Sequence, residues 1–188
     1  MSFQGSTVLV TGATGFLGGA IARRLAQEGA AVRALARREG RDAYLRGVAG
    51  IDIVMGNISD EGRMREVMQG CDYVIHSAAA LGGTLEHQRA ANVGGTRSVA
   101  QAAAAARVRR LVHVSSIAVY GYSYRSGVTE DMPQQPGRVA YNLSKSEAET
   151  ALRQTAAETG LSYSIIRPGM IYGPRSGAWT DTLFRLAK

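Results

Sequence analysis

Tyr141 and Lys145 are the two residues whose types and spacing best fit acid–base chemistry in this chain of 188 residues. They are four positions apart in Tyr141-Asn142-Leu143-Ser144-Lys145, so on a helix their side chains share one face. A tyrosine hydroxyl has an unperturbed pKa of about 10, which is too high for a base at neutral pH. A cation one helical turn away favours the phenolate and lowers that pKa. The pair therefore predicts proton transfer by Tyr141 with assistance from Lys145.

A glycine-rich turn near the N-terminus predicts a binding site for a dinucleotide. The segment Thr11-Gly12-Ala13-Thr14-Gly15-Phe16-Leu17-Gly18 follows an apolar run and leads into a helical pattern. Gly12 permits a tight turn, Gly15 lets the backbone approach a pyrophosphate, and Gly18 allows close packing of helix on strand. The N-terminus of the helix then attracts the anion. The spacing is G-x-x-G-x-x-G rather than the commoner G-x-G-x-x-G, but its position between strand and helix supports the same function.

The residues after the second expected strand bear on which dinucleotide binds. Arg37 and Arg38 follow the strand over residues 31–36, and no acidic residue comes before Glu39. An acidic side chain at this point would bind the ribose hydroxyls of NAD, whereas arginine favours the extra phosphate of NADP. In the alternative interpretation, both arginines only solvate a loop. We expect NADP, with NAD as the alternative cofactor.

Short β-rich runs alternate with helical patterns along the whole chain. Glycine follows three of the expected helices, at Gly29, Gly70 and Gly160, as C-caps require. This alternation predicts an α/β fold with a parallel sheet and helices on both faces. Two long loops, 117–140 and 168–180, leave the carboxyl ends of strands, where such sheets bind ligands. The expected strands cover 7–10, 31–36, 51–55, 73–75, 111–114 and 163–166, and the longest expected helices cover 85–106 and 141–159.

Composition excludes several other classes of protein. Hydrophobic residues make up 45% of the chain, which is too many for a disordered protein, and no apolar run is long enough to span a membrane. A signal-peptide pattern is missing from the first residues, so we expect a cytoplasmic protein. The single cysteine, Cys71, and the three separated histidines predict no disulfide framework and no metal site. The net charge of +7 is scattered, which favours a small anionic ligand over nucleic acid.

Six motifs in this order resemble the extended short-chain dehydrogenases/reductases, the group that includes NAD(P)-dependent sugar-nucleotide epimerases and dehydratases. The resemblance covers nearly the whole chain and implies a Rossmann-like doubly wound sheet forming one NAD(P)-binding domain over residues 1–188. The motifs are the glycine turn, His76-Ser77-Ala78-Ala79, Asn92-Val93-Gly94-Gly95-Thr96, Ser115-Ser116-Ile117-Ala118-Val119-Tyr120-Gly121, the Tyr141/Lys145 pair and Arg167-Pro168-Gly169-Met170-Ile171-Tyr172-Gly173-Pro174.

The resemblance assigns catalytic roles to three residues. Tyr141 would be the general acid/base at the substrate oxygen, and Lys145 would lower its pKa and hold the nicotinamide ribose. Ser116, rather than Ser115, would donate a hydrogen bond to the reacting oxygen. Tyr122 and its neighbours Tyr124 and Arg125, in the loop that follows, could face either substrate or solvent.

The resemblance also implies a set of cofactor contacts. Asn57 and Ile58 would flank the adenine, although the family more often has aspartate at position 57. An amide oxygen still accepts a hydrogen bond there but carries no charge. Asn92 could border the cofactor or bond the backbone, and His76 and His113 are expected to be packed or capping residues. The full expected set is Gly12, Thr14, Gly15, Phe16, Leu17, Gly18, Arg37, Asn57, Ile58, Ser77, Ala78, Ala79, Asn92, Tyr141, Lys145, Pro168 and Ile171.

These residues together predict hydride transfer with Tyr141 as acid/base, on a nucleotide sugar as the leading substrate class. The alternatives are a ketone or aldehyde reductase acting on dihydroflavonol- or hydroxysteroid-type molecules, and a catalytically silent dinucleotide-binding or redox-sensing module. Members of the family continue beyond the point where this chain stops, so we expect the C-terminal substrate-binding part to be missing or truncated. The alanine-rich helix and the 141–159 helix would pair across a homodimer.

Overall fold

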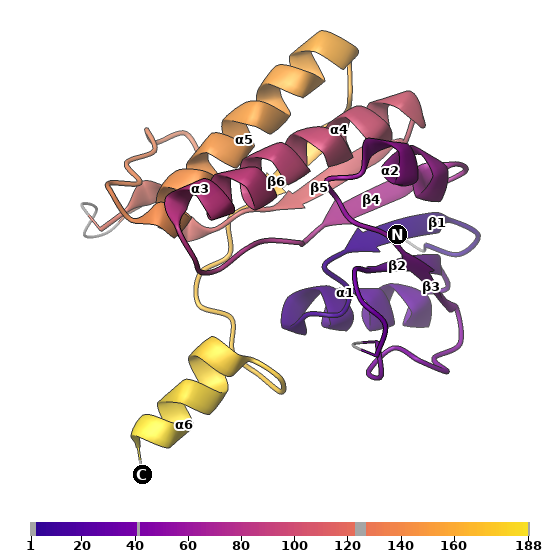
Figure 1. The fold of residues 1–188 in the computed structure, drawn as a ribbon, viewed down its shortest axis with the longest axis horizontal. Helices are drawn as coiled ribbons and strands as arrows, with labels where there is room; N and C mark the ends of the chain where they lie inside the picture. Colours follow the sequence, from indigo (N-terminus) through magenta and orange to yellow (C-terminus); the bar gives the residue numbers. More distant parts are fainter. Residues whose placement is uncertain (1–2, 41, 123–126, 188) are drawn as a thin grey trace.

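The computed structural model describes residues 3–40, 42–122 and 127–187, and its centre is a parallel β-sheet (Figure 1). Within this part of the chain the sheet has six strands in the order β3-β2-β1-β4-β5-β6. This is the strand order of a doubly wound dinucleotide-binding fold, so the predicted fold class is confirmed. The strands are β1 (Thr7–Thr11), β2 (Ala31–Ala36), β3 (Ile51–Met55), β4 (Tyr73–His76), β5 (Arg110–Val114) and β6 (Tyr163–Ile166).

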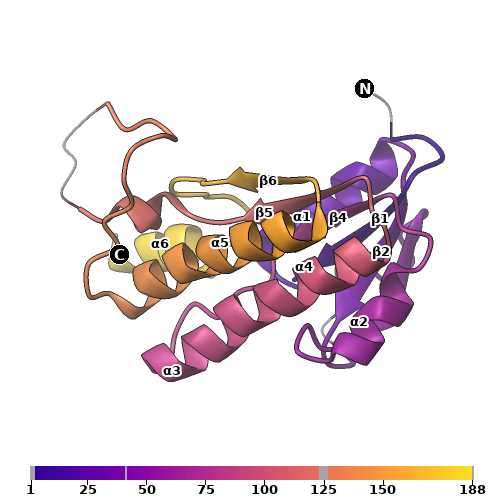
Figure 2. The same ribbon diagram turned by 90° about the horizontal axis from the view of Figure 1, so that it is seen from above.

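Helices cover both faces of the sheet because successive strand residues point to opposite sides. Val8 and Val10 of β1 pack toward α1 (Phe16–Gln27), whereas Leu9 packs toward the other face. That other face is covered by α2 (Glu61–Met68), α4 (Gly95–Ala105) and α5 (Ala140–Thr159) (Figures 1 and 2). The two cores, one on each side, hold the sheet in place and bring the carboxyl ends of its strands to one edge.

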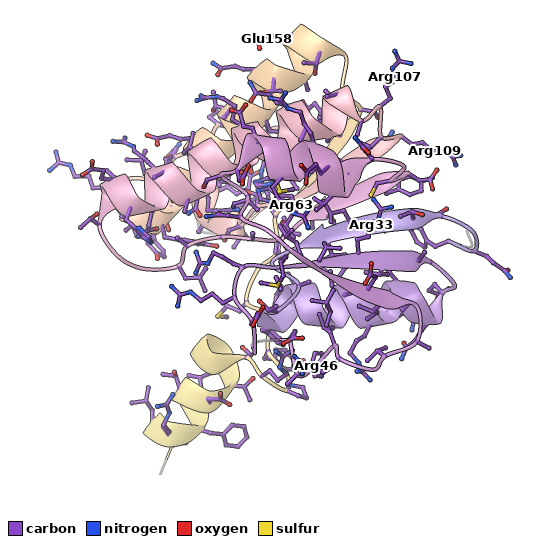
Figure 3. The ribbon with its side chains drawn as sticks, turned by 45° about the vertical axis from the view of Figure 1, so that its right-hand side comes forward. Arg33, Arg46, Arg63, Arg107, Arg109 and Glu158 are labelled. Carbon is purple, nitrogen blue, oxygen red and sulfur yellow. The ribbon has the colours of Figure 1, made fainter. Side chains whose placement is uncertain are left out.

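Two arginines join α2 to the sheet. Arg33 of β2 donates from Nη1 to the carbonyl oxygen of Val67 at 2.9 Å, near the end of α2. Arg63 of α2 donates from Nε to the carbonyl oxygen of Met55 at 2.7 Å, at the end of β3 (Figure 3). These bonds satisfy carbonyl groups that a helix or strand leaves open at its end. The labelled Arg107, Arg109 and Glu158 instead point outward at the periphery (Figure 3).

The predicted helix over 85–106 is one continuous helical segment of changing pitch. It consists of α3 (Leu85–Gln88), the π-helix η1 (Arg89–Gly94) and α4. The three glycines expected to close helices have left-handed backbones, with φ of 87° at Gly29, 71° at Gly70 and 73° at Gly160. The C-cap predictions are therefore confirmed.

The two long loops contain short helices that the sequence pattern did not indicate. A 3₁₀ helix, η2 (Ile117–Tyr120), lies in the first loop, where Ser116 Oγ accepts a hydrogen bond from the Ala118 amide at 3.1 Å. In the second loop, η3 (Gly177–Asp181) begins three residues before the loop was expected to end and leads into α6 (Thr182–Leu186). Among the described residues, no helix has both the length and the apolar character needed to cross a bilayer.

Candidate active site

The glycine turn between β1 and α1 is shaped by backbone contacts that leave no room for side chains. Gly12 has a φ of +68°, and a Cβ there would lie 2.7 Å from the backbone nitrogen of Ala78. A Cβ at Gly18 would lie only 2.3 Å from the carbonyl oxygen of Gly12. The Gly15 amide donates to that same oxygen at 2.9 Å and closes the turn. Gly12 and Gly18 thus occupy positions that demand the tight turn and the close packing expected of them.

The beginning of α1 fits an anionic ligand. The first amides of a helix have no acceptor within it. No side chain caps α1 at Gly15, and its first turn has no acidic residue. These amides and the positive end of the helix dipole therefore suit a pyrophosphate, and the missing Cβ of Gly15 allows close approach. Thr14, Phe16 and Leu17 are partly buried beside Gly15, so the whole predicted turn fits a bound dinucleotide.

The segment after β4 packs directly against this turn. The amide of Ala78 donates to Thr11 Oγ1 at 3.3 Å, and Thr11 Oγ1 is 2.7 Å from His76 Nδ1. His76 Nε2 lies 3.1 Å from Thr96 Oγ1. Burial, together with the charge of Lys145, lowers the pKa of His76 to about 3, so the ring stays neutral. His76 is a packed residue that positions Ser77, Ala78 and Ala79 next to the turn.

The expected adenine and phosphate residues follow β2 and β3, at the same edge of the sheet as the glycine turn. Arg37 is exposed directly after β2. Asn57 is exposed after β3, and its Oδ1 accepts a hydrogen bond from the Ser59 amide at 3.2 Å. Ile58 packs on the beginning of α4, where a Cβ at Gly95 would lie 2.5 Å from its Cδ1. Parallel strands thus bring these separated residues to one edge of the sheet.

Asn92 is buried in the π-helix η1 and bonds mostly to backbone. Its Oδ1 accepts from the amide of Ala80 at 2.7 Å, and its Nδ2 donates to the carbonyl oxygen of Ala80 at 3.1 Å. Nδ2 also donates to Ser144 Oγ of α5 at 3.0 Å. These contacts agree with the expected backbone-bonding role and tie the segment after β4 to the helix that carries Tyr141.

Lys145 is almost completely buried on α5, with 1% of its surface exposed. Its Nζ donates to the carbonyl oxygen of Val114, at the end of β5, at 2.8 Å. Burial lowers the pKa of Lys145 to about 8, against an opposing effect of Glu149. The ammonium is therefore fixed by the backbone of β5 and is still mostly protonated at pH 7.

Tyr141 lies one turn earlier on α5, with its hydroxyl close enough to that of Ser116 for the two to interact. Burial raises the pKa of Tyr141 above its ordinary value, and the Ser116 hydroxyl opposes that rise. The lowering by Lys145 that the spacing predicts does not appear, because burial dominates and the ammonium is bonded to Val114. The structure therefore brings Ser116, Tyr141 and Lys145 together but corrects the expected electrostatic effect on Tyr141.

Pro168 and Ile171 follow β6 and border the same region. The carbonyl oxygen of Pro168 accepts a hydrogen bond from the Ile117 amide at 3.0 Å, so this segment lies next to Ser116. The carbonyl oxygen of Ile171 accepts from Ser176 Oγ at 3.2 Å. Tyr122, considered as a substrate-facing residue, is 86% exposed, and Tyr124 and Arg125 lie outside the described residues.

A buried ion pair that the sequence pattern did not indicate lies beyond Tyr141 and Lys145 on α5. Glu149 has no exposed surface, and Arg167 donates to its two carboxylate oxygens at 2.9 Å and 2.7 Å. Gln134 Nε2 donates to the same carboxylate at 2.5 Å. Burial alone would raise the pKa of Glu149, but Arg167 holds it below its ordinary value. The available signal was spacing, because Glu149 follows Tyr141 and Lys145 at the same interval of four.

A cavity of about 510 Å³ lies beside the loop after β6 and has an almost entirely apolar lining. It lies between that loop and α6. Its lining residues are Met170, Tyr172, Gly173, Pro174, Thr180, Leu183 and Phe184.

The fold, the glycine turn and the Ser116–Tyr141–Lys145 group define a dinucleotide-binding α/β protein of the short-chain dehydrogenase/reductase type. The NAD dependent epimerase/dehydratase family model matches residues 8–187, and the chain belongs to this family. The resemblance inferred from the motifs is therefore confirmed.

Individual relatives differ in the molecules that their names mention. Sterol demethylase protein B of Methylococcus capsulatus is 35% identical over 174 residues, covering 89% of this chain and 52% of that protein. A putative dihydroflavonol 4-reductase of Synechocystis is 35% identical over 171 residues, covering 88% of this chain and 49% of that protein. The crystal structure of the dTDP-glucose 4,6-dehydratase DesIV from Streptomyces venezuelae, solved with NAD, has a TM-score of 0.82 and 30% identity, covering 90% of this chain and 57% of that chain. The chain thus spans about half the length of these curated relatives.

Proposed function

We propose that this chain forms the dinucleotide-binding and acid–base part of an NAD(P)-dependent epimerase, dehydratase or reductase. The observation that carries the proposal is the convergence of Ser116, Tyr141 and Lys145 near the end of β5. When bound, the nicotinamide would accept or supply a hydride at its C4. A catalytically silent dinucleotide-binding or redox-sensing module would need the glycine turn but not these three side chains.

Each of the three side chains has a distinct role in this proposal. Tyr141 Oη moves the proton at the substrate oxygen, and the Ser116 hydroxyl orients that oxygen by a hydrogen bond. Burial holds Tyr141 in its neutral form, so it begins as an acid when the reaction protonates a carbonyl oxygen. Lys145, one helical turn from Tyr141 and fixed by the carbonyl oxygen of Val114, would hold the ribose of the nicotinamide.

Replacement of Tyr141 by phenylalanine tests this function. We expect Tyr141→Phe to lower turnover about a thousandfold, as loss of a general acid/base does, and to change dinucleotide affinity by less than about twofold. Turnover is measured in a protein that contains this chain together with a substrate-binding segment. The affinity for the dinucleotide is measured by calorimetry. Tyr163, at the beginning of β6 and so away from the carboxyl edge, provides a matched control through Tyr163→Phe. Equal turnover by Tyr141→Phe and wild type would show that another group moves the proton.

The proposed cofactor preference is NADP, because Arg37 follows β2 where the adenosine ribose would lie. NAD is bound by the solved dehydratase structure, so the preference depends on Arg37 alone. A ligand that binds only the folded state at a hundredfold excess over its dissociation constant stabilises that state by about 2.7 kcal/mol. We expect a larger rise in melting temperature with NADPH than with NADH at equal concentration. A larger rise with NADH would overturn the role of Arg37.

The proposed substrate class is a nucleotide sugar, as in the dTDP-glucose dehydratase of similar fold. A second candidate, reduction of an apolar ketone, is favoured by the apolar cavity beside α6. The names of the two curated relatives, which mention a sterol and a dihydroflavonol, support that candidate. Thermal melts with the dinucleotide and either dTDP-glucose or a dihydroflavonol separate the two, because only the correct class adds further stabilisation.

We also propose a cytoplasmic homodimer that pairs through α4 and α5. Ala104 and Ala105, near the end of α4, are small and not fully buried, so they leave room for a second helix. Sedimentation equilibrium tests the assembly, and a monomer at micromolar concentration would contradict it.

A further inference from the structure

The loop after β6 reaches across the carboxyl edge of the sheet and touches the glycine turn through Arg175. Arg175 Nη2 donates to the carbonyl oxygen of Thr14 at 3.2 Å, and Nη1 donates to that of Gly15 at 3.4 Å. Strands β4 and β5 lie between β1 and β6, so the contact spans two strands. It joins the loop that holds Pro168 and Ile171, next to Ser116, to the turn expected to hold a pyrophosphate.

The local structure is shaped to admit this guanidinium. Arg175 has a φ of +75°, a backbone conformation that residues with side chains rarely adopt and that surrounding contacts must maintain. Gly19 lies inside α1, where glycine weakens a helix. A Cβ at Gly19 would lie 2.9 Å from Arg175 Nη1, so glycine leaves the space that the guanidinium occupies. Both features lower stability locally, and both serve the contact of Arg175 with the turn.

An aromatic ring holds the guanidinium from another side. Arg175 Cζ lies 3.9 Å from the centroid of the Tyr44 ring, within the range of a cation–π interaction. Arg23 of α1 also lies over that ring, at 4.8 Å, but its Nη1 donates to the carbonyl oxygen of Tyr44 at 3.1 Å. The two arginines therefore share an aromatic partner and differ in whether they bond the glycine turn.

We propose that Arg175 is a positioning residue for the pyrophosphate of the dinucleotide, a role that depends on the proposed function. In a trans peptide the carbonyl and amide groups point in opposite directions. By bonding the carbonyl oxygen of Gly15, Arg175 fixes the peptide whose amide belongs to Phe16, at the open beginning of α1. Its charge adds to the positive end of the helix. The same residue couples the loop beside Ser116 to cofactor binding.

The test compares Arg175→Gln with Arg23→Gln in the full chain. We expect Arg175→Gln to weaken ADP and NAD binding about fivefold, the effect of losing a charge-assisted hydrogen bond, and to leave adenosine binding unchanged. Arg23→Gln should leave all three affinities within about twofold, because Arg23 does not bond the turn. Arg175→Lys should restore part of the affinity for ADP and NAD through its charge. Affinities are measured by calorimetry.

Hydrogen exchange in the protein without ligand gives an independent measurement. Amides of the glycine turn, Gly15 to Gly18, should exchange faster in Arg175→Gln than in Arg23→Gln, because only the first loses its bonds to the turn. Equal affinities and equal exchange in the two variants would overturn the proposal, as would an equal loss of adenosine binding in Arg175→Gln. If wild type binds no dinucleotide, the proposed function fails and the pyrophosphate role with it. In that case, hydrogen exchange of the turn amides in the two variants still decides whether Arg175 stabilises the conformation of the glycine turn.

Discussion

The glycine turn and the end of α5 that carries Tyr141 and Lys145 are held in place by different means. The turn is shaped by backbone atoms in close contact, such as the 2.3 Å approach that a Cβ at Gly18 would make to Gly12. The α5 end is held by buried charged side chains, with Lys145 bonded to Val114 and Glu149 bonded to Arg167. One region excludes side chains, and the other depends on them.

This difference determines how each region should respond to change. A backbone turn fails when any atom is added, because its neighbours are backbone atoms that cannot move aside. A buried ion pair fails when one partner is removed, because the other charge remains without water or counter-ion. Substitutions in the two regions should therefore differ in size and in their dependence on pH.

The largest effect is expected at Glu149. Glu149→Gln should lower the free energy of unfolding by about 3 kcal/mol, because it leaves the Arg167 charge buried without its partner. Glu147 on the same helix pairs with Arg89 at 2.6 Å but is partly exposed, so Glu147→Gln should cost less than about 1 kcal/mol. Urea unfolding measures both. Equal losses would mean that burial does not distinguish the two pairs.

The pH dependence of the Glu149 effect has a definite sign. The folded-state pKa of Glu149 lies below its ordinary value, so its contribution is present above the unfolded pKa, about 4.3, and is lost as pH falls through the folded pKa. The difference in the free energy of unfolding between wild type and Glu149→Gln should therefore shrink as the pH falls below about 4.

The next effect separates conformation from steric contact in the glycine turn. Gly12 and Gly70 have similar φ values, +68° and +71°, but only Gly12 has backbone atoms where a Cβ would lie. Gly70→Ala should cost about 1 kcal/mol for the left-handed backbone alone. Gly12→Ala should cost about 2 kcal/mol more, through overpacking. Thermal unfolding measures both, and an equal fall in melting temperature would show that the close approach to Ala78 relaxes freely.

The smallest effect concerns Lys145 in alkaline solution. Its pKa is lowered to about 8 in the folded state, so between pH 8 and about 10.4 the unfolded chain binds more protons. Stability from this group therefore rises with pH across that interval, on the order of 1 kcal/mol by pH 9. Wild type should gain stability relative to Lys145→Met over this range in urea unfolding. If the difference in the free energy of unfolding between wild type and Lys145→Met stayed constant over this pH range, burial would not shift the pKa of Lys145.

Much of the site could be predicted because its signals are local in sequence. Gly12, Gly15 and Gly18 occur within one turn, and Tyr141 and Lys145 within one turn of helix. The strand and helix positions followed from short apolar patterns, with errors of one or two residues at most ends. The short helices within the two long loops were missed, because hydrogen bonds such as the one from the Ala118 amide to Ser116 Oγ create them.

The buried charges and the Arg175 contact could not be predicted from local pattern. Arg167, directly after β6, is 18 positions from Glu149, and the packing of α5 against the sheet brings these two together. Arg175 is 160 positions from Gly15, and the placement of β1 and β6 in one sheet brings these two together. The expected effect of Lys145 on Tyr141 was wrong for a related reason. Spacing indicates that two side chains are neighbours, whereas burial decides which form of each one is favoured.

The sequence by itself determined the α/β class, the parallel sheet and the residues that gather at its carboxyl edge. Those properties depend on periodicity and on glycine, both of which act over a few residues. Only the tertiary structure decided three contacts. Lys145 bonds the carbonyl oxygen of Val114, Glu149 is buried in an ion pair with Arg167, and Arg175 bonds carbonyl oxygens of the glycine turn. These contacts depend on exclusion of water and on distant strands meeting at one edge, and neither is encoded within a single segment.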